Sequence, residues 1–157
     1  MSKKILKLLR KGMRYGTLLS ALGLVLSVLI QIYGRFFLEA SPPWTEEASR
    51  LFFIYTVAFG AAPALLDGYF VFLDLISKRL PVSWRKPLEQ LVTFCIILVS
   101  GALAMYAWQF VVLGMAENSP GMHLPMAFAF FSMWLLFASL AVLPLLAWLG
   151  RTQKTKS

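Results

Sequence analysis

Residues 41–66 read SPPWTEEASRLFFIYTVAFGAAPALL, a charged and proline-rich start followed by a long apolar run. The charges of this stretch end at Arg50, and no charged residue follows until Asp67. The hydrocarbon core of a bilayer accepts about 20 consecutive apolar residues as one helix. The stretch therefore predicts a membrane-spanning helix over about 45–66, with its charged start at one membrane surface.

Three more segments are apolar over a similar length: 17–37, 91–113 and 124–149. The chain is 59% hydrophobic and 14% charged, whereas soluble domains carry about 25% charged residues. Polarity does not alternate along these runs as it does in barrel strands. The first run also exceeds the roughly 7–15 apolar residues of a signal peptide. We therefore predict an all-α integral membrane protein, with four transmembrane helices in a single membrane domain over 1–157.

The chain has a formal net charge of +8, and its Lys and Arg gather in three segments: 3–14, 78–86 and the basic tail 151–157. The intervening segments 38–45 and 114–123 contain neither Lys nor Arg. Positive charge marks the cytoplasmic side of a membrane protein. We therefore expect both termini in the cytoplasm, and we attribute the charge to topology and lipid contact rather than to nucleic-acid binding.

Two segments on the cytoplasmic side have amphipathic patterns. We predict that 69–80 forms a short helix lying along the membrane interface, with Trp84 beyond it as a headgroup anchor. The apolar side chains of this helix share one face: Tyr69, Phe72, Leu73, Ile76 and Leu80. Residues 5–16 leave two interpretations open, a short basic helix on an anionic leaflet or an extension of the first span.

The sequence offers little chemistry for catalysis. Gln31 and Gln109 are polar but lie toward the ends of their spans. We expect each of them to make an interhelical hydrogen bond there. His123 is the only histidine and Cys95 the only cysteine, so the pattern of a closed zinc site or an internal disulfide is missing. We predict no enzyme activity, no metal and no cofactor. The acids also sit at span ends, which argues against a proton-coupled exporter with an acid deep in the membrane.

The charged residues at 44–50 fit the start of a helix at a membrane surface. Trp44 suits the interfacial aromatic belt. With Thr45 as the predicted N-cap, Glu46 and Glu47 fall in the first turn, where the helix dipole favours negative charge. Arg50 would lie about 6 Å deeper than Glu46. Its guanidinium would pair with its own glutamates, with a lipid phosphate or with a carboxylate of a partner protein.

This pattern resembles the small membrane subunit, the DctQ type, of tripartite ATP-independent periplasmic (TRAP) transporters. Two segments carry the resemblance: WTEEASRLFFIYTVAFGAAPALLDG and ENSPGMHLPMAFAF. The matching residues are Trp44, Glu46, Glu47, Arg50, Gly60, Gly68, Asp74, Ser119, Pro120, Leu124 and Pro125. Tyr69 stands where the family usually has histidine. The resemblance covers about residues 15–150.

The resemblance implies a scaffold in the bacterial inner membrane. Such subunits accompany a large membrane subunit that carries the sodium sites and the substrate path, and a periplasmic binding protein that delivers an organic acid. The small subunit would then have no catalytic or sodium-binding residues. Its candidate contacts with the partner or with phospholipids are Trp44, Glu46, Glu47, Arg50, Tyr69, Asp74 and Trp84. The alternative is a stand-alone small four-span membrane protein, either an exporter or an assembly factor.

Overall fold

The computed structural model describes residues 2–37, 42–67 and 82–152, with only the backbone given near several helix ends. Four helices make up this part of the chain: α1 (Ser2–Phe37), α2 (Pro43–Leu66), α4 (Val82–Leu113) and α5 (Ala127–Thr152). Each is long and apolar enough to cross a membrane. The predicted all-helical fold with four such helices is confirmed. The expected interfacial helix over 69–80 lies outside the described residues.

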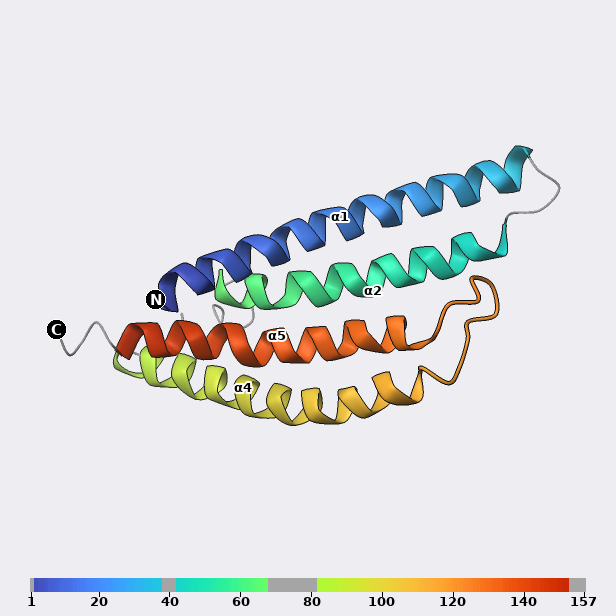
Figure 1. Cartoon of the computed structure of the whole chain (residues 1–157). Coiled ribbons are helices and arrows are strands. Elements are labelled where there is room, and N and C mark those ends of the chain that lie inside the picture. The colour runs from blue at the N-terminus through green and yellow to red at the C-terminus, as the bar shows by residue number, and fades with distance from the viewer. Residues whose placement is uncertain (1, 38–41, 68–81, 153–157) are drawn as a thin grey trace.

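The helices run side by side in the order α1, α2, α5, α4, so that neighbours in space are not always neighbours in sequence (Figure 1). The most extensive contacts join α1 with α2, α2 with α5, and α5 with α4, while α1 touches α5 to a smaller extent. The start of α1 and the end of α5 lie at the same end of the bundle (Figure 1). We call this end the basic end, and we call the opposite end, which holds residues 42–50 and 114–126, the loop end.

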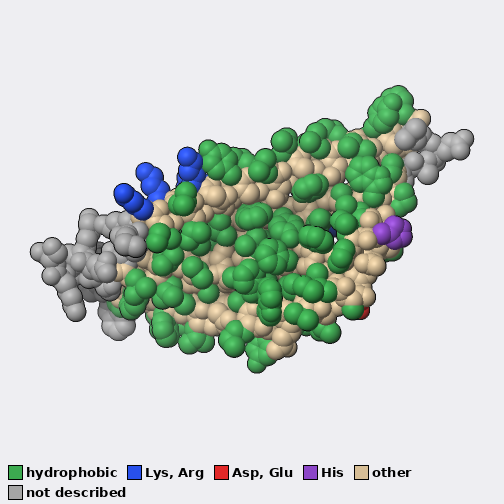
Figure 2. All heavy atoms as spheres, viewed as in Figure 1, with side chains coloured by type: hydrophobic (Ala, Val, Ile, Leu, Met, Phe, Trp, Pro, Cys, Tyr) green, Lys and Arg blue, Asp and Glu red, His purple; other side chains and the backbone are tan. Residues whose placement is uncertain are grey.

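The first helix is continuous over 36 residues. At 1.5 Å per residue it is about 54 Å long, well beyond the roughly 30 Å of a hydrocarbon core. Residues 5–16 are therefore an extension of the first span and not a separate helix. Their positive side chains lie on the surface of the basic end, beside the apolar surface of the helices (Figure 2).

Small residues bring α1 and α2 close together. A Cβ added at Gly16 would lie 2.7 Å from the ring of Phe59, and one added at Gly23 would lie 2.6 Å from the ring of Phe52. Each glycine thus provides the space that a phenylalanine ring from the other helix fills. Helices in membranes typically approach closely at small residues. No hydrophobic effect drives helices together within lipid, so their association depends on van der Waals packing. Ala62 is fully buried and packs with Met13 of α1 and Leu143 of α5.

Besides α1, which begins at Ser2 and not at 17, and α2, which begins at Pro43 and not at 45, the starts of α4 and α5 also differ from the segments expected from hydropathy. The fourth segment was expected to begin at 124, but α5 begins at Ala127. Its predecessors form loop hydrogen bonds instead, from the Ser119 amide to the Leu124 carbonyl at 2.8 Å and from the Met126 amide to the Glu117 carbonyl at 2.8 Å. In contrast, α4 begins at Val82, before the apolar run, and includes Pro87 near its start.

Candidate functional site at the loop end

The start of α2 is built from two prolines and a buried threonine. Pro42 is the N-cap and Pro43 the first helical residue, a position that proline favours because it has no amide hydrogen to leave unpaired. The predicted N-cap at Thr45 is therefore wrong: the helix begins earlier, and the Thr45 side chain is buried within its first turn. The Thr45 hydroxyl donates to the Pro42 carbonyl at 2.7 Å. This bond fixes the first turn.

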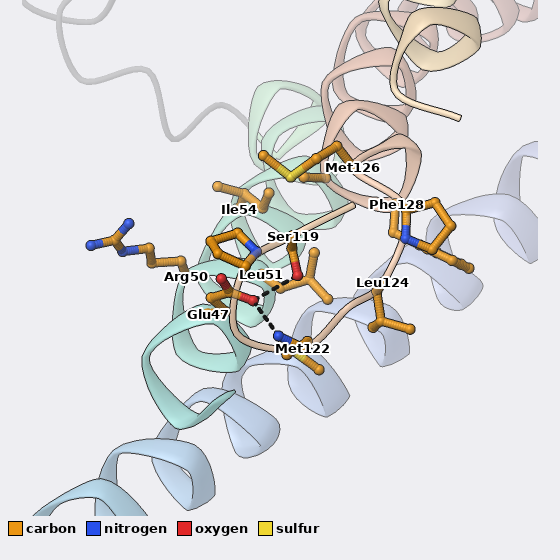
Figure 3. Close-up of a pocket in the computed structure, with 12 residues that line it drawn as sticks. Glu47, Arg50, Leu51, Ile54, Ser119, Met122, Leu124, Met126 and Phe128 are labelled. Atoms are coloured by element: carbon orange, nitrogen blue, oxygen red, sulfur yellow. Dashed lines mark hydrogen bonds between the residues drawn. The ribbon is translucent and has the colours of Figure 1, made fainter. Parts of the chain in front are cut away.

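The carboxylate of Glu47 binds the loop between α4 and α5. One oxygen accepts from the Ser119 hydroxyl at 2.7 Å and from the Met122 amide at 2.7 Å. The other oxygen accepts from the Gly121 amide at 2.7 Å. Figure 3 shows the Glu47 side chain turned toward this loop. A carboxylate that accepts three short hydrogen bonds makes charge-assisted contacts, which are about twice as strong as neutral ones.

Gly121 packs closely against the Glu47 carboxylate. A Cβ at this position would lie 3.0 Å from the carboxylate carbon of Glu47. An alanine here would require the carboxylate to shift by a few tenths of an ångström. The two segments that carry the family resemblance, at 44–50 and around 119–125, thus meet at one point in space.

Residues 114–126 form a compact loop. Asn118 and Pro125 pair as an isolated antiparallel bridge, and the His123 amide donates to the Ser119 carbonyl at 3.1 Å. His123 adopts a left-handed backbone conformation with φ of 54°, and its side chain is exposed. In the described part of the chain, no three His, Cys, Asp or Glu side chains gather closely enough to hold a metal ion.

Arg50 pairs with Glu46 through Nη2 and Oε1, one helical turn apart. Both side chains are exposed, by 74% for Arg50 and 58% for Glu46. Such a surface pair contributes about 1 kcal/mol or less to stability. Figure 3 shows the guanidinium directed away from the loop. Of the alternatives open from sequence, the structure has the pairing within α2, and most of the guanidinium's donors stay accessible to a further group.

A pocket of about 310 Å³ lies between α2 and the start of α5. Its lining is largely apolar, and its polar members are Glu47 and Arg50 of α2 and Ser119 of the loop (Figure 3). The other lining residues are Leu51, Ile54, Pro120, Met122, Leu124, Pro125, Met126, Phe128 and Ala129. The Tyr55 hydroxyl donates to the Phe128 carbonyl at 2.9 Å and joins the same two helices.

The seven candidate contact residues fall into separate places. Trp44, Glu46, Glu47 and Arg50 share the loop end, where Trp44 is 41% exposed. Trp84 belongs to the start of α4, with its side chain outside the described residues. Tyr69 and Asp74 lie outside the described residues altogether. A role for these seven residues in contacts with a partner or a lipid stays a prediction.

Sequence reasoning missed a second ionic cluster, at the basic end. Arg14 Nη2 donates to Asp67 Oδ2 at 2.7 Å, and Arg10 Nη1 lies 3.2 Å from Asp67 Oδ1. The two arginines of α1 thereby hold the last turn of α2. From the sequence alone, these arginines indicate only the topology. A single sequence does not show that α1 extends far enough to meet Asp67.

Comparison with known proteins identifies the family of this chain. Residues 24–154 match the family described as tripartite ATP-independent periplasmic transporters, DctQ component. A Haemophilus influenzae protein that carries the name of a TRAP transporter small permease is 25% identical over 127 residues, which is 81% of this chain and 77% of the relative. The family match spans most of the chain, including α2, the loop at 114–126 and both ionic clusters' acids. The chain therefore belongs to the DctQ component family and is a membrane subunit of a TRAP transporter.

Proposed function

We propose that the chain is a scaffold that stabilises the large membrane subunit of a sodium-coupled importer of organic acids. Membership of the family implies a large membrane subunit and a substrate-binding protein as partners in general. The proposal adds the division of labour: the partner carries the ions and the substrate, and this chain holds the partner in the bilayer. The complex would reside in the bacterial inner membrane.

The observation that carries the proposal is the apolar surface on both flanks of the row of helices. On α4, Phe94 is 61% exposed and Met105 76%. On α1, Leu22 is 57% exposed and Phe36 79%. In a row of four helices each flanking helix has a single extensive neighbour, so a long apolar face stays available on either side. Large apolar and aromatic side chains are the ones that dominate protein contacts.

The distribution of charge supports the same division of labour. The stretches 15–34, 51–66 and 90–116 contain no Asp, Glu, Lys or Arg. Ion and substrate paths through membranes are usually lined by ionisable or strongly polar groups that face the interior of a bundle. A path for an organic acid and sodium is therefore expected in the large subunit.

We further propose that the basic end faces the cytoplasm and the loop end faces the periplasm. The start of α1 gathers Lys and Arg (Figure 2), and cytoplasmic flanks of membrane proteins carry an excess of these residues. The loop at 114–126 would then lie on the side from which a periplasmic binding protein approaches. The predicted interfacial helix over 69–80 would lie on the cytoplasmic side.

Reconstitution tests the scaffold role directly. Proteoliposomes would contain this chain alone, the large subunit alone, or both, each with the binding protein outside and an inward sodium gradient. We expect uptake of the organic acid only with both subunits present. We also expect the large subunit to aggregate when it is purified without this chain. Sodium-dependent uptake by this chain alone, or full uptake and stability of the large subunit without it, would overturn the proposal.

A further inference from the structure

We propose that the loop-end pocket binds one acyl chain of a zwitterionic phospholipid whose ammonium and phosphate groups lie against Glu46 and Arg50. This inference depends only on the chain being in a bilayer. It does not depend on the scaffold role, because it concerns a site that this chain contains by itself.

The pocket has the position that a lipid needs. Of its lining residues on α2, Glu47 and Arg50 lie nearest the start of the helix, within two turns of Trp44, a residue type that gathers at the membrane interface. From Glu47 to Ile54 the pocket follows α2 for about 10 Å at 1.5 Å per residue. A headgroup at the level of Trp44 would therefore place the upper part of its acyl chain beside Leu51 and Ile54.

The lining fits an apolar chain. Ligand pockets run from about 300 Å³ upward, so a volume of about 310 Å³ is large enough for the upper part of a single acyl chain. Met122 and Met126 lie on the wall, and methionine side chains adapt their shape to irregular apolar ligands. The polar Glu47 carboxylate does not disturb this lining, because the loop already satisfies it through three hydrogen bonds.

The charges at and beside the pocket select the class of headgroup. Glu47 and Arg50 line the pocket, and Glu46 lies beside it, paired with Arg50 one helical turn away. Glu47 is bound by a hydroxyl and two amides, which carry no positive charge. A purely anionic headgroup would meet a surplus of negative charge. In a headgroup with a primary ammonium and a phosphate, the ammonium can donate to Glu46 and the phosphate can accept from the accessible donors of Arg50.

Native mass spectrometry of the full chain, released from detergent after incubation with lipid, tests the proposal. The probes are phosphatidylethanolamine, phosphatidylcholine and phosphatidylglycerol at equal concentration. We expect phosphatidylethanolamine to be retained best, since its ammonium donates hydrogen bonds that the methylated choline cannot. Preference for phosphatidylglycerol, or equal retention of all three lipids, would overturn the proposal.

Two variants locate the site. Arg50→Ala should lower retention of phosphatidylethanolamine about tenfold, the effect of one lost charge-assisted hydrogen bond. Its control is Arg35→Ala, an arginine in the last turn of α1. Ala129→Phe should fill the pocket and lower retention similarly, whereas Val142→Phe, on an exposed position of the same helix, should not.

A variant that fails to fold is replaced by the exchange Glu46→Arg with Arg50→Glu. This double variant keeps an ion pair one turn apart but reverses the positions that the ammonium and phosphate would meet. It should retain less phosphatidylethanolamine than the wild type. Wild-type retention in the exchange variant, or in Arg50→Ala and Ala129→Phe, would show that the lipid binds elsewhere and would overturn the assignment.

Discussion

Glu47 belongs to α2, yet its carboxylate binds a segment 72 or more residues further along the chain. Neighbouring Glu46 has the same charge and faces Arg50 instead. The sequence places both glutamates at the start of a helix but does not distinguish them, because both suit the helix dipole there. The difference comes from the position of the loop, which only tertiary structure provides. The prediction that the acids and Arg50 cluster at one end of the bundle needed no more than hydropathy and helical periodicity.

Glu47→Gln is expected to loosen the loop at 119–122. Glutamine keeps the length of the side chain but removes the charge and replaces one acceptor oxygen with an NH₂ group that cannot accept from an amide. Losing one charge-assisted hydrogen bond should speed hydrogen–deuterium exchange at the Gly121 and Met122 amides by about tenfold. The control is Glu46→Gln, which should leave these amides as they are. Equal exchange in wild type and Glu47→Gln would mean that the carboxylate does not hold the loop.

At the scale of the helices, the apolar runs predicted which segments are helical, but not which helices touch. Gly16 and Gly23 show why. These glycines leave space that phenylalanine rings of α2 fill. A single sequence does not reveal the register between two helices and so does not show which rings these are. The same holds for Asp67, whose partners on α1 became visible only because that helix is continuous beyond the membrane core.

Gly23→Ala is expected to destabilise the α1–α2 pair. The new methyl group would lie 2.6 Å from the Phe52 ring, and overpacking of this kind costs about 1–3 kcal/mol. Gly12→Ala is the matched control on the same helix, since nothing lies within 4 Å of its added Cβ and alanine favours a helix by up to about 1 kcal/mol over glycine. Thermal unfolding in detergent should therefore move in opposite directions for the two variants. A Tm for Gly23→Ala at or above that of the wild type would contradict the close packing.

Asp67→Asn is expected to free the two arginines of α1 from the end of α2. Each ion pair is partly exposed, with side-chain exposures of 22–57%, so each contributes about 1 kcal/mol or less. We expect a drop in Tm of a few degrees at low salt, which shrinks at high salt because ions screen the pairs. Glu46→Gln, which breaks a single and more exposed pair, should have a smaller effect. A drop for Asp67→Asn that does not change with salt would point to lost packing instead.

For the whole molecule, a row of helices with two apolar flanks predicts that one flank binds the large subunit and the other faces lipid. Truncation on α4, Phe94→Ala with Met105→Ala, and truncation on α1, Leu22→Ala with Phe36→Ala, remove comparable exposed surface. Neither should change the Tm of the isolated chain much, because all four side chains are more than half exposed. Co-purification with the large subunit should fall for one pair and stay near wild type for the other. If both pairs assembled and supported transport at the wild-type level, neither flank would be the contact surface, and the attachment would have to involve the ends of the helices instead.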